Sequence, residues 1–421
     1  MRRVQIKNQI LNEIDRRENE LIELCSNLIK IPSENPPGDT SRVADFATEF
    51  LRKRDRTVQK YAPKKNLVSI VSELGTAEEP HLVLNGHMDV FPAGGQRWDF
   101  DPFSGDVRKG KIFGRGATDM KAGVAAFLFA YALIGELGVM VPGKLVLSLV
   151  ADEESGGKWG TEWLLNNVPS LSGDACLIAE PGGTDSVVFG EKGRCQFRIR
   201  AKGIAGHSPM PFRTANAIVK MARLIPVIDS LKDLEVTIPH ELAEVIEGDK
   251  IHYDEIIGEG AGRALDHLTV NVGIIQGGRN INTVPDECQV DVDVTLPPGI
   301  SPEEVKAELD SRLRSTGLTD IQCEFIEEYP FHRPSLYTST GEKIVRLTFD
   351  NVKAVTGREP KYFIKQWGTD GKFFRKKNIP TVVYGTSEMT AEPNECVAIE
   401  ELRNVTKVHA ATIIDFLFED A

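Results

Sequence analysis

The chain has 421 residues, of which 41% are hydrophobic and 27% charged, and its formal net charge is −12. This length exceeds one ordinary hydrophobic core, so we expect two domains. The negative charge disfavours nucleic acid as a partner, because phosphate binding needs a concentrated basic face. No uninterrupted apolar run reaches the roughly 18 residues that a membrane span requires, so we expect no contact with a membrane.

The N-terminus and the cysteines both favour a cytoplasmic protein. The first residues are basic, but no apolar segment or small-residue cleavage site follows them, so we expect no secretory signal. The six cysteines are scattered, without a Cys-x-x-Cys pair. This pattern argues against a disulfide framework and a thiolate zinc site, and it is typical of a reducing compartment.

The first part of the chain predicts an α/β domain. Apolar residues at helical spacing predict helices over residues 10–28, 43–51 and 123–137, with a Pro- and Gly-rich loop at 33–40. Short β-rich runs predict strands at 66–71, 81–85 and 145–150. Strands that alternate with helices favour a mixed sheet with helices on both faces.

From about residue 187 the order of elements changes to β-α-β-β-α-β, which is that of a ferredoxin-like α+β unit. Predicted strands lie at 195–200, 268–275, 287–296 and 321–325, and predicted helices lie at 216–231 and after Ser301. Ser301, Pro302 and Glu304 form a capping-box pattern. The charged stretch 232–266 is interpreted as an insertion. We therefore expect a discontinuous catalytic domain, residues 1–188 and 333–421, and an inserted lid domain, residues 189–332.

Four segments that follow apolar runs carry groups able to bind a metal. They are residues 85–90 with His87 and Asp89, 114–123 with Asp119, 150–157 with Glu153 and Glu154, and 178–181 with Glu180. Each alone is ambiguous: Asp119, for example, is equally well placed to cap a helix. Three consecutive acids at 152–154 repel one another, and a cation is the simplest way to hold them together. The four segments together predict a metal site with hard ligands, in which Asp89 orients the His87 ring.

At this point the sequence resembles the metallopeptidase family of acetylornithine deacetylase, succinyl-diaminopimelate desuccinylase, aminoacylase and glutamate-releasing carboxypeptidases. The resemblance covers nearly the whole chain. Its motifs, in order, are G-H-x-D (86–89), a G-R-G-x-x-D-x-K-G-like segment (114–123), D-E-E-x-G (152–156), E-P (180–181), G-x-x-G-H-S (203–208), N-x-V-P (282–285) and G-T-D (368–370).

The resemblance implies a role for each matching residue. Asp119 would bridge two zinc ions, His87 and Glu180 would complete the first, and Glu154 would bind the second; cobalt or manganese could replace zinc. Glu153 would be the general base for a metal-bridging water that attacks an amide carbonyl. His207, in the lid domain, would stabilise the oxyanion in the active site of the partner subunit of a homodimer. Asn282 and Thr369 would contact the substrate.

The sequence departs from the family pattern at position 391. Relatives carry H-x-x-N-E near the C-terminus, whereas this chain has Ala391 in place of the histidine and keeps Asn394 and Glu395. Alanine cannot bind a metal, so the second zinc position is expected to be weakened and the enzyme impaired. Glu392 lies one residue beyond the position of the missing histidine, so we do not expect it to replace the histidine as a metal ligand. Because every other motif is intact, we favour an engineered over a natural origin for this His→Ala change.

The resemblance implies that the substrate is a small amide or a short peptide, and three functions remain open. The first is hydrolysis of an N-acyl amino acid or a related amide. The second is a dipeptidase or carboxypeptidase with the same site. The third is a non-catalytic binding protein with an incomplete metal site, against which the intact Glu153 argues. Thr295 stands where many relatives have an Arg that grips a substrate carboxylate, so a substrate without that carboxylate, or one gripped by another residue, is also plausible.

Overall fold

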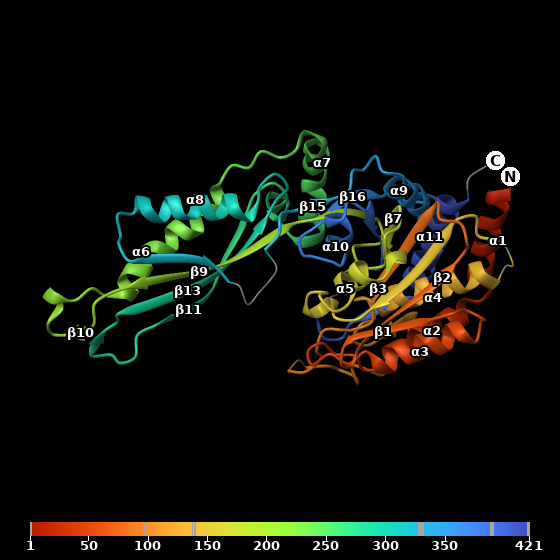
Figure 1. Ribbon diagram of the computed structural model, residues 1–421, viewed down its shortest axis with the longest axis horizontal. Helices are drawn as coiled ribbons and strands as arrows, with labels where there is room; N and C mark the ends of the chain where they lie inside the picture. Colours follow the sequence, from red (N-terminus) through yellow and green to blue (C-terminus); the bar gives the residue numbers. More distant parts are fainter. Residues whose placement is uncertain are drawn as a thin grey trace. The chain divides into compact units, whose positions relative to one another are not determined.

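The computed structural model of the chain describes residues 2–95, 97–136, 138, 140–326, 332–387 and 391–418. The chain divides into two compact units, which can be followed by colour in Figure 1. The first unit comprises residues 1–190, 337–365 and 369–421, and the second comprises 191–336 and 366–368.

The first unit combines helices with a mixed sheet. Its helices are α1 (Arg2–Arg16), α2 (Glu18–Ile29), α3 (Ser41–Arg52), α4 (Lys121–Glu136), α5 (Thr161–Asn167), α9 (Lys343–Thr356), α10 (Gly371–Lys376) and α11 (Ile399–Leu417). The expectation of one helix over 10–28 was wrong, because the helical segment begins at Arg2 and divides at Arg17, whose φ of −107° and ψ of 23° are not helical.

A nine-stranded sheet, counted over the described residues, forms the centre of this unit, in the order β1-β2-β6-β3-β7-β17-β8-β15, with β16 paired to β8. Its strands are β1 (Gln59–Lys64), β2 (Leu67–Leu74), β3 (His81–His87), β6 (Lys144–Val150), β7 (Ala175–Ile178), β8 (Ser186–Glu191), β15 (Leu336–Tyr337), β16 (Lys361–Lys365) and β17 (Thr381–Val383). A smaller sheet contains β4 (Asp106–Arg108), β5 (Lys111–Phe113) and β18 (Cys396–Ala398).

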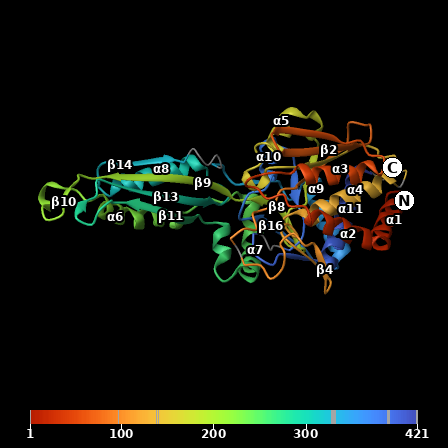
Figure 2. The ribbon, with the colours of Figure 1, turned by 90° about the horizontal axis from the view of Figure 1, so that it is seen from below.

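Three adjacent strands at the centre of the large sheet run parallel. β3 pairs with β6 on one side and with β7 on the other. Figures 1 and 2 show α4 and α11 against one face of the sheet and α5 and α10 against the other, which confirms the predicted fold class. Because parallel strands end at the same edge, the residues that follow β3, β6 and β7 are brought together there.

Helix α4 is buried along most of its length, and this burial positions the segment before it. Its residues from Lys121 to Ile134 are almost completely inaccessible to solvent. Gly123 allows the helix to approach the end of β7: a Cβ at this position would lie 2.2 Å from the carbonyl oxygen of Ala179. The close approach brings Asp119, two residues before α4, next to Glu180.

The second unit has the predicted ferredoxin-like order. Its strands are β9 (Gly193–Lys202), β10 (Gly206–His207), β11 (Thr269–Gly277), β12 (Thr283–Val284), β13 (Glu287–Leu296) and β14 (Ile321–Phe325), and its helices are α6 (Ala217–Asp229), α7 (His240–Ile257) and α8 (Pro302–Ser315). The main sheet is antiparallel, in the order β11-β13-β9-β14. α6 and α8 contact this sheet and close an apolar core around Phe197 and Val292. The capping box at Ser301 is confirmed, and the stretch 232–266 contains α7.

Two further properties bear on the environment of the protein. None of the helices in the described ranges combines the length and the apolar character needed to cross a bilayer. The thiols of all six cysteines are free.

Candidate metal centre

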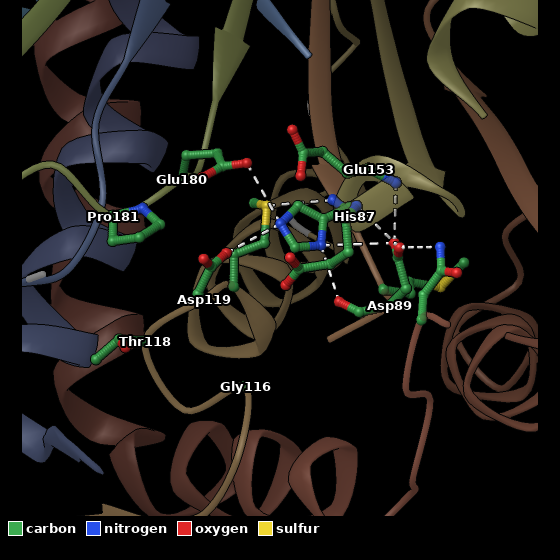
Figure 3. A network of polar contacts seen from close by, with 12 residues as sticks. His87, Asp89, Gly116, Thr118, Asp119, Glu153, Glu180 and Pro181 are labelled. Carbon is green, nitrogen blue, oxygen red and sulfur yellow. Dashed lines mark hydrogen bonds and ion pairs between the residues drawn. The ribbon is translucent and has the colours of Figure 1, made fainter. Parts of the chain in front are cut away.

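The predicted metal ligands of the first unit meet at the carboxyl edge of its central strands (Figure 3). His87 is the last residue of β3, Glu153 and Glu154 follow β6, and Glu180 follows β7. Asp119 approaches them from the loop before α4. The parallel pairing of the strands therefore brings together residues that are far apart in the sequence.

His87 lies at the centre of this group and is only 1% exposed. Its Nδ1 donates a hydrogen bond to the backbone carbonyl of Asp89 at 2.9 Å, and the Asp89 carboxylate lies 3.6 Å away. The carbonyl can only accept, so this contact places the proton on Nδ1 and leaves Nε2 with a lone pair for a metal. Nε2 lies 3.0 Å from Asp119 Oδ1 and 3.3 Å from Glu180 Oε1.

The turn after β6 separates Glu153 from Glu154. Asp152 has a left-handed backbone with φ of 75°, and its carboxylate accepts the Trp159 N–H at 3.0 Å. The buried Asp89 carboxylate accepts the N–H groups of Glu153 at 3.3 Å and Glu154 at 3.1 Å. As a result, Glu153 and Glu154 belong to two different sets of possible metal ligands.

Two sets of three side chains can each surround a cation: His87 with Asp119 and Glu154, and His87 with Glu153 and Glu180. In each set the donor atoms lie within 4.8 Å of one another. Among the described residues, the buried Glu154 Oε1 has no hydrogen-bond partner. A buried carboxylate oxygen without a donor is costly unless a cation satisfies it, so these residues fit a divalent ion.

The pKa values of His87, Glu153 and Glu154 are shifted by burial and by the charged side chains that lie close to them. Burial, followed by the negative charge of Glu180, raises the pKa of Glu153 well above its usual range, and burial with Asp119 does the same for Glu154. Burial alone would lower the pKa of His87, but its contacts with Asp119, Asp89 and Glu180 raise it well above the usual value. A bound divalent ion would compete with these protons for the same lone pairs.

Two buried lysines also contact the acids of the site. Lys365 Nζ lies 3.4 Å from Glu180 Oε2 and donates to the carbonyl oxygen of Pro181 at 2.6 Å. Lys372 Nζ lies 3.8 Å from Glu153 Oε1. Although burial by itself would raise the pKa of Glu180, Lys365 and His87 overcome this effect and lower it to about 2.

The segment that carries Ala391 lies beside the Asp119 loop. Glu395 is fully buried and accepts hydrogen bonds from the N–H groups of Thr118 at 2.7 Å and Asp119 at 3.2 Å. Ala391 is half-buried, with φ of 57°, and its methyl side chain offers no ligand atom. Glu392 is exposed and belongs to neither set of metal donors.

The other predicted site residues lie elsewhere. Thr369 is buried in the first unit, where its carbonyl oxygen accepts the Lys372 ammonium at 3.0 Å. His207 and Asn282 are exposed in the second unit and are neighbours, since His207 pairs with Thr283 across β10 and β12. Close to them is a groove of about 720 Å³, and its lining includes Ser208 and Arg279.

Sequence analysis missed several residues that shape the site. Lys365 and Lys372 were not predicted, because a single lysine in an apolar or mixed segment resembles an ordinary surface residue. Asn35 was assigned only to a loop, yet its side-chain amide donates to the Asp89 carboxylate at 2.9 Å. For Glu395 the only signal was the family pattern, which did not reveal its contacts with the Asp119 loop.

Comparison with known proteins shows which family the chain is similar to. The model of peptidase family M20/M25/M40 matches residues 83–415. A succinyl-diaminopimelate desuccinylase of Methylorubrum populi is 28% identical over 403 residues, which cover 93% of this chain and 97% of the relative. The N-formyl-4-amino-5-aminomethyl-2-methylpyrimidine deformylase of Bacillus subtilis is 26% identical, with 96% of this chain and 95% of that protein covered.

Solved structures share the fold. The M20 family metallo-carboxypeptidase Sso-CP2 of Sulfolobus solfataricus superposes with a TM-score of 0.76 at 20% identity, and the match covers 94% of this chain and 99% of that one. Human carnosine dipeptidase 1 gives a TM-score of 0.72 at 16% identity, with 98% and 99% covered. At these identities the likeness concerns the fold alone.

Proposed function

The chain belongs to peptidase family M20/M25/M40 and is a metal-dependent hydrolase of amide bonds, and we propose that its substrate is an N-acyl amino acid or a similar small amide. One observation carries the proposal: His87 forms one set of metal donors with Asp119 and Glu154 and a second with Glu153 and Glu180, and the donor atoms of each set lie within 4.8 Å of one another. The two relatives named above remove an acyl group from an amine, which favours a deacylase over other amide hydrolases.

We assign a centre for two divalent ions to these residues, with Asp119 shared between the ions, His87 and Glu180 at the first and Glu154 at the second; zinc is the proposed metal, with cobalt or manganese as alternatives. Imidazole nitrogen together with carboxylate oxygens suits all three. When bound, a divalent ion supplies Lewis-acid polarisation of the amide carbonyl and lowers the pKa of a water to about 7. Asp89 keeps the His87 ring oriented, so that Nε2 faces the other donors.

Glu153 is the proposed general base. It does not need to be a ligand, because the turn after β6 directs it away from Glu154 and toward Glu180. In the proposed reaction Glu153 takes a proton from the attacking water and later gives it to the leaving amine, so that one carboxylate serves both steps. Its burial raises its pKa and thus its affinity for that proton.

The second unit is the proposed source of the oxyanion donor and of the dimer contact. His207 and Asn282 are exposed together beside the groove, which supports a role in holding substrate. β11 ends its sheet and carries exposed Ile274 and Ile275, a surface that favours pairing with a second copy. A homodimer is therefore proposed, and light scattering after size-exclusion chromatography tests it: a monomer at micromolar concentration would contradict the proposal.

The free thiols of the six cysteines support the cytoplasm as the proposed compartment.

Ala391 favours a second candidate, a non-catalytic binding protein that keeps the fold and has an incomplete metal site. A substrate panel separates the candidates and also tests the dipeptidase alternative. The chain and its Ala391→His variant are loaded with zinc and assayed on N-acetyl, N-succinyl and N-formyl amino acids and on dipeptides. Hydrolysis of the acyl amino acids in preference to dipeptides supports the proposal. Preference for dipeptides supports a peptidase, and binding without hydrolysis in both proteins supports the non-catalytic reading.

A further inference from the structure

We propose that Asn35 is a positioning residue that joins the chain after β3 to the turn after β6, and so sets where the proposed metal ligands of these two segments lie. The inference rests on the proposed metal-dependent function and deepens it, because it gives a task to an uncharged side chain. The amide of Asn35 acts through Asp89 and through the turn at 152–155.

The loop that carries Asn35 is fixed to the chain that follows β3. The N–H of Asn35 donates to the Val90 carbonyl at 2.9 Å, and the N–H of Val90 donates to the Ser33 carbonyl at 3.0 Å. Asn35 is 4% exposed, and Gly38 leaves room for its side chain, since a Cβ at Gly38 would lie 3.0 Å from Asn35 Oδ1. The backbone of Asn35 is therefore held beside the segment that contains Asp89.

The side chain of Asn35 extends from this segment to the turn after β6. Its Nδ2 donates to Asp89 Oδ2 at 2.9 Å and to Asp152 Oδ1 at 3.4 Å. Its Oδ1 accepts from Ser155 Oγ at 2.8 Å. Ionised carboxylates can only accept, so the nitrogen of the amide must face the two aspartates and the oxygen must face the serine. A single amide thus contacts both segments, and its donor and acceptor are both used.

Asp89 transmits this contact to the metal ligands. Its carboxylate is 0% exposed, accepts the N–H groups of Glu153 at 3.3 Å and Glu154 at 3.1 Å, and lies 3.6 Å from His87 Nδ1 (Figure 3). Within the described ranges, Asn35 is the only side chain that donates a hydrogen bond to this carboxylate at 3.5 Å or less. A buried acceptor that loses a donor is costly, so without Asn35 the Asp89 carboxylate would turn from its present contacts.

Both sets of metal donors depend on the groups that Asp89 holds. His87 belongs to both sets, Glu154 belongs to one and Glu153 to the other. Removal of a residue that orients metal ligands typically costs about 10- to 100-fold in metal affinity or activity. We therefore expect Asn35 to influence zinc binding and turnover together, although its amide is directed at Asp89 and the turn.

The test compares full-length variants of the two ends of this contact. Asn35→Leu keeps the size of the side chain and removes its polar atoms, Asn35→Ala also opens space, and Ser155→Ala removes only the hydroxyl that orients the amide. Asn351→Leu is the matched control, because Asn351 is 3% exposed and donates to Asp415 Oδ2 at 3.0 Å, outside both sets of metal donors. Competition with a chromophoric chelator measures zinc affinity, urea unfolding without zinc measures stability, and kcat and KM are measured at saturating zinc.

We expect Asn35→Leu to lower zinc affinity by about 10- to 100-fold and to lower kcat at saturating zinc, while KM changes by less than about twofold. Asn35→Ala should change both in the same direction, and Ser155→Ala should show a smaller loss. Asn351→Leu should lose stability and keep its zinc affinity, which a purely structural role of Asn35 would equally predict for the Asn35 variants.

Two results would overturn the inference: zinc affinity within about twofold of the unmodified chain in both Asn35 variants, or an equal loss of zinc affinity in Asn351→Leu. If neither Asn35 variant folds, the exposed Ser155→Ala decides, and an unchanged zinc affinity there overturns it. Hydrolysis is judged separately: a chain whose zinc affinity depends on Asn35 but that hydrolyses no amide refutes the proposed function and leaves this inference intact.

Discussion

Glu395 accepts the backbone N–H of Asp119 at 3.2 Å, so the segment that contains Ala391 is joined to the loop that carries a proposed metal ligand. The same carboxylate accepts the Arg115 guanidinium at 2.7 Å, and both side chains are at most 1% exposed. The backbone N–H groups of Gly116, Thr118 and Asp119 and a buried cation thus converge on Glu395. It positions Asp119, although it belongs to neither set of metal donors.

The first prediction concerns this buried carboxylate. Glu395→Gln keeps one oxygen that can accept from Thr118 and Asp119, but its NH2 group then faces the Gly116 N–H and the Arg115 guanidinium, which are donors themselves, and the Arg115 charge is left uncompensated. We expect the free energy of unfolding to fall by about 3 kcal/mol, as when one member of a buried ion pair is removed. Urea denaturation measures the change. The exposed Glu392→Gln is the control and should stay within about 0.5 kcal/mol; equal values for the two variants would contradict this role.

The second prediction concerns Ala391 itself. Its φ of 57° is a conformation that His and Asn adopt more readily than most residues, so a histidine fits the backbone here. Ala391→His should give the bound ion a nitrogen ligand, tighten zinc binding by about tenfold or more and raise amidase activity. Ala391→Asn shares the backbone preference and lacks the imidazole. If the two variants bind zinc as weakly as the unmodified chain, position 391 is not a ligand position.

Much of this architecture could be predicted from the sequence, and the reasons are local. β3, β6 and β7 each contain a short apolar run, and the acids that come after these strands interrupt the apolar pattern. The short strands β4 and β5 were not predicted, since three residues give no periodicity. The contacts of Lys365 with Glu180 and of Glu395 with Asp119 join residues 185 and 276 positions apart, and a single sequence carries no local signal for such pairs.

The third prediction is a pH dependence of stability that arises from His409 in α11. Its Nε2 donates to the Tyr384 carbonyl at 2.8 Å, and burial lowers its pKa from 6.5 to about 4. Between these two pH values the unfolded chain binds a proton at His409 that the folded chain does not bind. The contribution of His409 to the free energy of unfolding is therefore complete above pH 6.5 and is lost as the pH falls toward 4. By pH 5 the loss should reach about 2 kcal/mol.

His409→Gln isolates this effect, because the glutamine amide can still donate to Tyr384 but does not titrate. Urea unfolding of both proteins at pH 7.5 and pH 5 gives the difference in stability at each pH. We expect the free energy of unfolding of the unmodified chain to exceed that of His409→Gln by less at pH 5 than at pH 7.5. A difference that is the same at both values would show that His409 is not held neutral by burial.

The fourth prediction tests the second unit. If His207 stabilises the oxyanion, His207→Ala should lower kcat by about 10²- to 10³-fold while zinc content stays unchanged. His240, an exposed histidine of the same unit, provides the control, and His240→Ala should leave kcat unchanged. Equal losses of zinc and of turnover in His207→Ala would remove this residue from the oxyanion role.

The most direct test of the account compares Glu153→Gln with Glu154→Gln in zinc-loaded protein, on the N-acyl amino acid that is cleaved fastest. These neighbouring residues are assigned different tasks, and each variant removes one charge from the same turn. The account predicts that Glu153→Gln keeps its zinc and loses at least about 10²-fold in kcat, while Glu154→Gln loses zinc together with activity. Loss of zinc in Glu153→Gln and retention of both zinc and activity in Glu154→Gln would contradict it.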